Sequence, residues 1–341
     1  MKLAAKLSLT VVVIFLACSV YGETDPSPRK ASASPTPSLS ERRIADLERE
    51  ISVLKKEISF TKMPAIPEQL SLCDKSLPLL DEDVREDFER EFYQFLENKG
   101  LLTILVRRHG KFFTTVSAEI DRVSLPPDLI YLAIVESYLN PRAKSNASAG
   151  GIWQFIKDTG KREGLFINDT VDERYSVTRA TRSALGYLKK LHDEFGDWFL
   201  AMAAYNCGEG RVREAIANQN SKDFFELFLP EETDRYVYRI AALKEILGNP
   251  SRYGLPIEKR DYYRPYAVAE VTVEVTDKEI HTLTLSQAME VPYKVFREYN
   301  LQIRKYRLPR GTYHIYVPFE KKEAFLKGLR NCPSISVQRQ G

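Results

Sequence analysis

One glutamate in this sequence occupies a position where a carboxyl group could do acid–base chemistry. Glu136 follows the segment 129–135 (LIYLAIV), which is apolar on every side and is therefore predicted to form a buried helix. Leu129, Leu132 and Ala133 precede Glu136 at the helical spacing i, i+3, i+4, i+7, which predicts that the carboxylate lies on an apolar face. Burial raises the pKa of a carboxyl group, and a protonated acid can donate to the leaving oxygen of a glycosidic bond. A buried glutamate held in an ion pair is the alternative that this helix alone leaves open.

The residues that follow Glu136 favour a proton-donating acid over a glutamate buried in an ion pair. Segment 140–155 (NPRAKSNASAGGIWQF) is short and polar, and Gly150 and Gly151 allow the backbone to approach a ligand closely. Trp153 and Gln154 are predicted to offer an aromatic face and a bidentate amide, which together suit a sugar. The side chains that could aim hydrogen bonds at the carboxylate are Ser145, Asn146 and Ser148. We expect this segment to form the wall of a ligand cleft.

Three ordered motifs resemble one known family. The first contains Glu136-Ser137, Asn140-Pro141, Ala143, Ser145, Gly151 and Gln154. The second runs through 203–212 (AAYNCGEGRV), and the third pairs Glu232-Thr233 with Tyr236-Val237. Together they resemble the soluble lytic transglycosylase domain of glycoside hydrolase family 23, which is related to goose-type lysozyme, over roughly residues 70–255. Phrases such as GGIWQF and PEETDRYV are typical of its membrane-bound D branch.

The resemblance implies a reaction on peptidoglycan and a role for each site residue. Glu136 would protonate the bond between N-acetylmuramic acid and N-acetylglucosamine. It would then accept the proton of the muramoyl C6 hydroxyl, which closes a 1,6-anhydro ring without water. Ser145 would hold Glu136 or the N-acetyl group by a hydrogen bond, and Tyr236 would lie near the acid. The residues implied to line the sugar subsites are Gln154, Tyr205 and Asn206, with Glu232 as a less certain wall residue. No cofactor and no metal is implied.

Two other functions remain open at this stage. A hydrolytic, lysozyme-like muramidase needs a second carboxylate to activate water or to act as nucleophile. No second acid lies on a comparable apolar helix face, and Glu209, between two glycines, is predicted to be solvated. The other alternative is an inactive scaffold that only binds peptidoglycan. The presence of Glu136 together with Ser145, Gln154 and Tyr205 argues against it.

The elements that must position these residues are mainly helical. Periodic apolar patterns predict helices at 81–98, 101–121, 128–137, 180–195, 198–205, 210–218 and 233–247. From about residue 265 the period changes, and alternation predicts strands at 267–275 and 311–318. A helical stretch at 285–300, split near Pro292, lies between them. We therefore expect a lysozyme-like helical domain at 70–255, followed at 265–330 by a small α+β module that weakly resembles a LysM-type unit. Glycan binding and a purely structural cap are both open for this module.

The N-terminal segments predict export. Lys2 and Lys6 precede the uncharged run 7–17, which has the length of a signal-peptide core, so 1–22 is predicted to be a signal peptide. An imperfect lipoprotein box ending at Cys18 is the alternative, and it would anchor the chain to a membrane. We expect a periplasmic or cell-envelope protein, with an outer-membrane lipoprotein as the second form.

Two further segments separate the predicted signal peptide from the helical domain. Residues 23–40 are rich in Pro and Ser and read as a linker. In 41–62 the heptad positions 44, 47, 51, 54 and 58 are Ile or Leu, which predicts a helix. It either packs on its own domain or self-associates weakly through 44–58.

Composition excludes several classes of protein. The 50 basic and 47 acidic residues give a net charge of +3, which does not predict nucleic-acid binding. Four Cys without a C-x-x-C pair and four scattered His disfavour a metal site. Cys73 and Cys332 remain after the predicted processing and could pair in an oxidising compartment.

Overall fold

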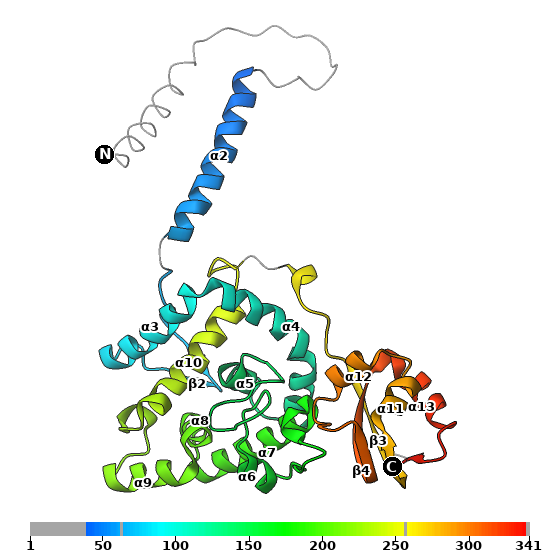
Figure 1. Ribbon diagram of the computed structural model, residues 1–341. Helices are drawn as coiled ribbons and strands as arrows, with labels where there is room; N and C mark the ends of the chain where they lie inside the picture. The colour runs from blue at the N-terminus through cyan, green and yellow to red at the C-terminus, as the bar shows by residue number, and fades with distance from the viewer. Residues whose placement is uncertain (1–38, 62–63, 256–257, 339–341) are drawn as a thin grey trace, which may run out of the picture. The chain divides into compact units, whose positions relative to one another are not determined.

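The computed structural model describes residues 39–61, 64–255 and 258–338 (Figure 1). Its chain divides into two units, residues 1–62 and 63–341. The predicted signal peptide, Cys18 and nearly all of the predicted linker lie outside the described residues. The described part of the first unit is one helix, α2 (Leu39–Thr61). On its heptad seam Ile44 and Ile51 are 56% and 42% exposed and Leu47 is half-buried, and self-association through this seam stays a prediction.

Helices build the first part of the second unit, as the sequence predicts. They are α3 (Glu82–Glu97), α4 (Lys99–Arg122), α5 (Leu129–Ser137), α6 (Lys157–Arg162), α7 (Val177–Phe195), α8 (Trp198–Cys207), α9 (Glu209–Gln219) and α10 (Glu231–Gly248), with 3-10 turns η1 (Glu173–Tyr175), η2 (Phe224–Glu226) and η3 (Lys259–Asp261). A small hairpin of β1 (Ser71–Leu72) and β2 (Lys75–Ser76) precedes them. The sequence analysis missed this hairpin because two residues per strand carry no alternation.

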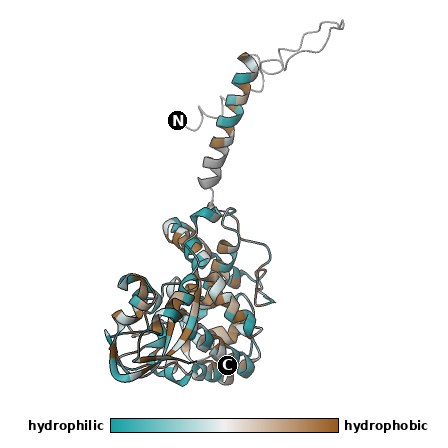
Figure 2. Cartoon of the chain, turned by 90° about the vertical axis from the view of Figure 1, so that its right-hand side faces the viewer, coloured by the Kyte–Doolittle hydropathy of each residue, from teal (hydrophilic) through white to brown (hydrophobic). Residues whose placement is uncertain are grey.

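Local sequence signals explain where these helices begin and end. The Asp81 side chain accepts hydrogen bonds from two backbone amides at the start of α3, and Asp197 does the same for α8. Gly196 ends α7 in the left-handed conformation, with φ of 70°. Apolar and polar residues mix along most of the helices (Figure 2). Helix α5 is the exception, since nearly all of its side chains are buried, and it packs against α4 and α10.

The C-terminal module is a small α+β unit. Its elements are β3 (Val268–His281), α11 (Thr282–Ala288), α12 (Tyr293–Tyr299), β4 (Arg307–Pro318), η4 (Phe319–Lys321), α13 (Lys322–Leu329) and β5 (Ile335–Val337). The three strands form an antiparallel sheet in the order β4-β3-β5. Val271, Val273 and Val275 alternate into the core, which is the pattern that predicted this strand. The predicted split of the helical stretch is confirmed, whereas α13 and β5 were missed, and the LysM-type resemblance stays a prediction.

The module and the helices share an interface within the second unit. Backbone hydrogen bonds join Asp172 N to Gln302 O at 2.8 Å and Arg304 N to Thr170 O at 2.7 Å. The ring of Tyr266, which leads into β3, lies 5.6 Å from the ring of Phe112 in α4. These contacts couple the module to the helical core.

The cysteines make no disulfide among the described residues. Cys73, Cys207 and Cys332 are all free thiols. Cys73 belongs to the core of the helices, whereas Cys332 packs against the separate core of the module. The pairing of Cys73 with Cys332 that the sequence left open is therefore wrong for this structure.

Candidate active site

Glu136 lies near the C-terminal end of α5, where the buried helix meets the surface. Its side chain keeps partial access to solvent, although protein surrounds most of it. Burial raises the pKa of Glu136 from 4.5 to about 7, while the Tyr236 hydrogen bond and the Arg239 charge act to lower it and the Glu232 charge acts to raise it. A carboxyl group with this pKa is substantially protonated near neutral pH. It can therefore both donate and accept a proton.

Two tyrosines, the buried Tyr236 and the half-buried Tyr205, lie near the carboxyl group. Tyr236, from α10, donates its hydroxyl hydrogen to Oε1 of Glu136. Tyr205, from α8, donates to the carbonyl oxygen of Trp153 at 2.7 Å. Burial, with the nearby charge of Glu136, raises the pKa of both phenols well above the ordinary value. Both hydroxyls therefore stay protonated and act as fixed hydrogen-bond donors.

The loop after α5 is held by its own hydrogen bonds. The hydroxyl of Ser145 accepts from the backbone N–H of Ala149 at 3.1 Å, and Gln154 Nε2 donates to Gly151 O at 2.7 Å. Ser145 is exposed, and no hydrogen bond between it and Glu136 is present in the described part of the chain. The roles implied for Ser145 and Gln154 toward a sugar therefore stay predictions.

Arg174 braces this loop from the other side. Its guanidinium forms a bidentate pair with Asp172, at 2.9 and 2.7 Å, and donates to the carbonyl oxygens of Ser148 and Phe155. Gly151 has φ of 80°, and a Cβ there would lie 1.8 Å from the carbonyl oxygen of Arg174. Gly151 therefore allows the loop after α5 to pack directly against the backbone of Arg174. The sequence analysis did not identify Arg174, which lies in the segment 172–176 (DERYS), as a residue of the site.

Trp153 does not offer its ring to a ligand, which corrects the expectation from the sequence. Its side chain is fully buried, and its Nε1 donates to the hydroxyl of Thr181 at 2.9 Å. An indole that finds a buried acceptor is a core residue. Asn206 accepts from the hydroxyl of Thr233 at 2.7 Å, so the second and third motifs are joined side chain to side chain.

The sequence analysis also missed a buried carboxylate. Glu91, on the apolar face of α3, is 1% exposed. Arg235 and Arg239 from α10 approach it at 2.5 and 3.9 Å, and Arg90 lies at 3.3 Å. The phenylalanines around Glu91 dominate the pattern of α3, and no local signal identifies partners 144 residues further along the chain.

A pocket of about 560 Å³ lies beside this cluster. Arg235 and Arg239 line it together with Tyr138 and Glu232. Two of these lining residues, Glu232 and Arg239, act electrostatically on Glu136, which does not itself line the pocket.

Glu209 is paired rather than simply solvated. It accepts from the hydroxyl of Tyr187 at 2.7 Å and lies 3.4 Å from Arg162. Partial burial acts to raise its pKa, but the backbone amide, Tyr187 and Arg162 outweigh burial and lower it. The Tyr187 ring in turn lies 5.6 Å from the Tyr205 ring. Glu209 is therefore ionised and connected to the site through two tyrosines.

Comparison with known proteins agrees with the motifs. Residues 116–228 match the family model described as Transglycosylase SLT domain. The resemblance predicted from the sequence is thereby confirmed over this SLT segment, which contains Glu136, Ser145, Gln154, Tyr205 and Asn206 but not Tyr236.

Individual relatives are similar to part of the chain. Membrane-bound lytic murein transglycosylase D of Escherichia coli K12 is 40% identical over 179 residues, which are 51% of this chain and 40% of that protein. The putative tributyltin chloride resistance protein of Alteromonas sp. strain M-1 is 38% identical over 108 residues, 31% of this chain and 52% of the relative. A solved structure of the lytic transglycosylase Slt from Pseudomonas aeruginosa, an inactive mutant, aligns with a TM-score of 0.35 and 25% identity over 45% of this chain and 26% of that one. The chain thus spans less than half the length of the first relative.

Within the described residues, no helix combines the length and apolar character needed to cross a membrane.

Proposed function

We propose that this protein is a peptidoglycan lytic transglycosylase that cleaves the β-1,4 bond between N-acetylmuramic acid and N-acetylglucosamine without water. The observation that carries the proposal is the state of Glu136: its pKa is raised to about 7, and it accepts a hydrogen bond from Tyr236. The match of the SLT segment and the name of the E. coli relative support the same substrate class.

The proposed mechanism uses Glu136 twice. Its protonated form donates to the glycosidic oxygen, and the carboxylate that remains accepts the proton of the muramoyl C6 hydroxyl as that oxygen attacks C1. Attack by a hydroxyl of the same sugar is intramolecular, which gives it a large effective concentration over water. The hydrogen bond from Tyr236 holds the carboxyl group in one orientation through both steps. No cofactor takes part in this mechanism.

A hydrolytic muramidase is the second candidate, and one observation favours it. Glu232 lies close enough to Glu136 for its charge to raise the pKa of that carboxyl group. A carboxylate in this position could activate water. The two functions differ by one water molecule in every product, so mass spectrometry of the fragments separates them. Mostly 1,6-anhydromuramoyl ends support the lyase, and mostly reducing N-acetylmuramic acid ends support the hydrolase.

The remaining parts of the chain fit an envelope enzyme. Export through the predicted signal peptide, with Cys18 as the alternative lipid anchor, would place it with peptidoglycan. For the C-terminal module, which is coupled to the helices, we propose a role in holding the glycan near the site; the structural cap is the alternative.

The test is the purified Glu136→Gln variant on isolated sacculi. The amide keeps the shape of the side chain but has no transferable proton, so turnover falls by about 10²–10⁴-fold or more while the variant still sediments with sacculi. Activity near that of the wild type would refute the assignment. If wild type and variant both leave sacculi intact but bind them, the protein is the scaffold that the sequence left open.

Stability provides the control for this test. The pKa of Glu136 is about 7 in the folded protein and 4.5 as the ordinary value, so the folded protein binds this proton more tightly than the unfolded chain does. The free energy of unfolding that Glu136 contributes is therefore lost as the pH rises from 4.5 through about 7. Glu136→Gln should therefore be more stable than wild type above about pH 8, by up to about 3 kcal/mol, with little difference below about pH 4.5. An inactive variant that gains stability in this way has not lost activity by unfolding.

A further inference from the structure

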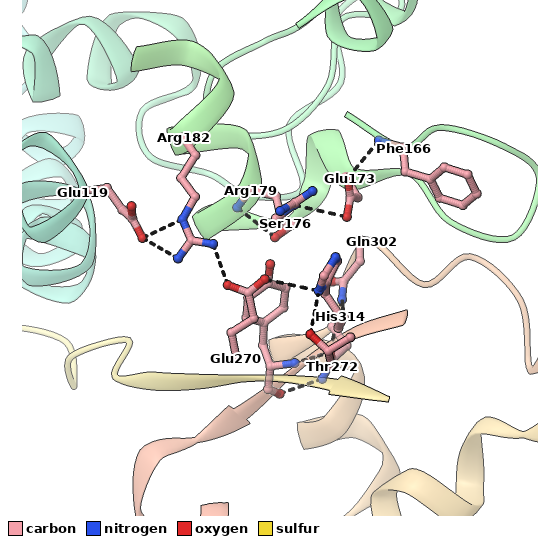
Figure 3. Close-up of polar contacts among 12 residues, drawn as sticks. Glu119, Phe166, Glu173, Ser176, Arg179, Arg182, Glu270, Thr272, Gln302 and His314 are labelled. Carbon is pink, nitrogen blue, oxygen red and sulfur yellow. Dashed lines mark hydrogen bonds and ion pairs between the residues drawn. The ribbon is translucent and has the colours of Figure 1, made fainter. Parts of the chain in front are cut away.

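A second groove lies where the C-terminal module meets the helical part of the chain. It has a volume of about 240 Å³. Phe166, Glu173 and Arg179 contribute to it from the helical part, and Gln302, Tyr313 and His314 from the module. Figure 3 shows the polar residues of the two parts facing one another here. None of these residues belongs to the candidate active site.

One residue that lines this groove carries a buried acceptor without a partner. Gln302 is 2% exposed, and its Nε2 donates to Asn300 Oδ1 at 3.2 Å and to His314 O at 3.0 Å. Its Oε1 has no hydrogen bond in the described structure. An unsatisfied buried acceptor is costly, so it favours a ligand that brings a donor.

The orientation of this amide is fixed by its neighbours. Asn300 Oδ1 accepts from the backbone N–H of Tyr316 at 2.8 Å, so it cannot be exchanged with the nitrogen of the same amide. A reversed Gln302 amide would then place its oxygen against two acceptors. The unpartnered atom is therefore the oxygen, which can accept only from an N–H or O–H group.

The charges around the groove are paired. Glu173 lies 3.4 Å from Arg179 and also accepts from the backbone N–H of Phe166 at 2.8 Å. His314 Nδ1 lies 3.4 Å from a carboxylate oxygen of Glu270, which also binds Arg182 at 2.6 Å. A free anion or cation would have to compete with these pairs. The groove therefore suits a neutral ligand rich in hydroxyl and amide groups.

An aromatic ring completes the site. Phe166 lines the groove and is 54% exposed, so its ring is available to the apolar face of a ligand. The volume is below the usual 300–1,000 Å³ of sites for larger ligands, so it fits a single ring. A neutral ring with hydroxyls, an amide N–H and one apolar face describes an N-acetylated hexosamine.

We propose that this groove, named the junction groove, is a second binding site that takes one N-acetylhexosamine unit of a glycan strand. The identity of the ligand rests on the proposed function. Glu173 faces the groove, while the next residue, Arg174, braces the loop after Glu136. The short turn η1 thus joins the junction groove to the candidate active site. Glycan held in the groove would keep a strand near the acid between cuts.

The test uses the full chain carrying Glu136→Gln and the tetramer of N-acetylglucosamine as the probe. Hydrogen exchange followed by mass spectrometry should show protection at 166–179 and 300–314, in addition to the loop at 143–155. Adding Phe166→Ala should weaken binding at the groove by about three- to tenfold and remove its protection, while protection of the loop stays. Phe319→Ala, which removes another exposed phenylalanine ring (68% exposed) outside the groove, is the matched control.

Gln302→Met gives a second measurement: it keeps the length of the side chain but removes the whole amide, both the acceptor oxygen and the Nε2 that donates to Asn300 and His314, so its folding is checked by urea denaturation. It should weaken groove binding by about two- to tenfold without changing the loop. Protection confined to the loop, or Phe166→Ala binding as well as Phe319→Ala, would overturn the proposal. Protection of the groove by a free stem tripeptide but not by the tetramer would also overturn it. Sacculus digestion by the wild type is scored separately, so failed cleavage with a protected groove counts against the enzyme and not against the groove.

Discussion

Removal of the Tyr236 hydroxyl should extend the activity of this protein to higher pH. Tyr236 donates to Glu136, and this hydrogen bond is stronger to the carboxylate than to the carboxylic acid. It therefore lowers the pKa of Glu136 against the larger effect of burial. Tyr236→Phe keeps the buried ring and deletes only the donor, so the pKa of Glu136 rises further.

The size of the shift follows from the charge on the acceptor. A hydrogen bond to a charged group contributes about 1.5–3 kcal/mol, and one pKa unit corresponds to about 1.4 kcal/mol. The pKa of Glu136 should thus rise from about 7 by about one to two units. Because the protonated form is the active acid, activity is lost as pH rises through this pKa. The alkaline limb of the kcat/KM profile moves upward by the same amount, even if the maximal rate falls.

The assay is the release of soluble fragments from sacculi between about pH 5 and pH 10, for wild type and variant. Tyr187→Phe is the matched control, because it deletes a hydroxyl that donates to Glu209 and leaves its ring beside Tyr205. The alkaline limb of the Tyr187→Phe profile should stay within a few tenths of a pH unit of the wild-type limb. A limb that stays in place in Tyr236→Phe, or moves to lower pH, would show that Tyr236 does not act on the ionised acid.

Two other changes separate electrostatics from packing. Glu91→Gln removes the carboxylate that pairs with Arg239, so the charge of Arg239 acts more fully on Glu136. The alkaline limb of the kcat/KM profile should therefore move to lower pH. Glu119, a comparable arginine-paired carboxylate on α4, provides the control, because Glu119→Gln should leave that limb in place. Gly151→Ala should lower the free energy of unfolding by about 1–3 kcal/mol or more, because its Cβ would lie 1.8 Å from a carbonyl oxygen, as measured by urea denaturation. Gly164→Ala, with φ of 88° and nothing near its Cβ, should cost only about 1 kcal/mol, and equal losses would refute the packing argument.

The sequence predicted the acid because its signal is local. An apolar helix with one carboxylate at its end predicts burial and a raised pKa; Glu136 is mostly surrounded by protein and has the raised pKa. The helices and the two long strands of the module were also predictable from their periods, since each runs over many residues. Elements of two or three residues, such as β1, β2 and β5, are too short to show a period.

Side chains whose partners lie far along the chain were not predictable. Trp153 looked like a sugar platform because its loop is polar, but Thr181, 28 residues away, accepts its N–H inside the core. Glu91 looked like one charge on an amphipathic helix, yet its main partner is 144 residues away. In both cases tertiary contacts decide whether a residue serves the core, the electrostatics or the ligand.

The carboxylates around the site differ in a way that explains how one of them stays protonated. Tyr236 and Arg239 both lie on α10, so α10 brings a cation toward Glu136 along with the hydroxyl that orients it. A free arginine beside Glu136 would ionise it and remove the proton that the proposed reaction needs. Glu91, on α3, pairs with Arg239 as well as with Arg235 and so limits the effect of Arg239. The ion pairs of Glu91 and the raised pKa of Glu136 are thus parts of one arrangement around α10.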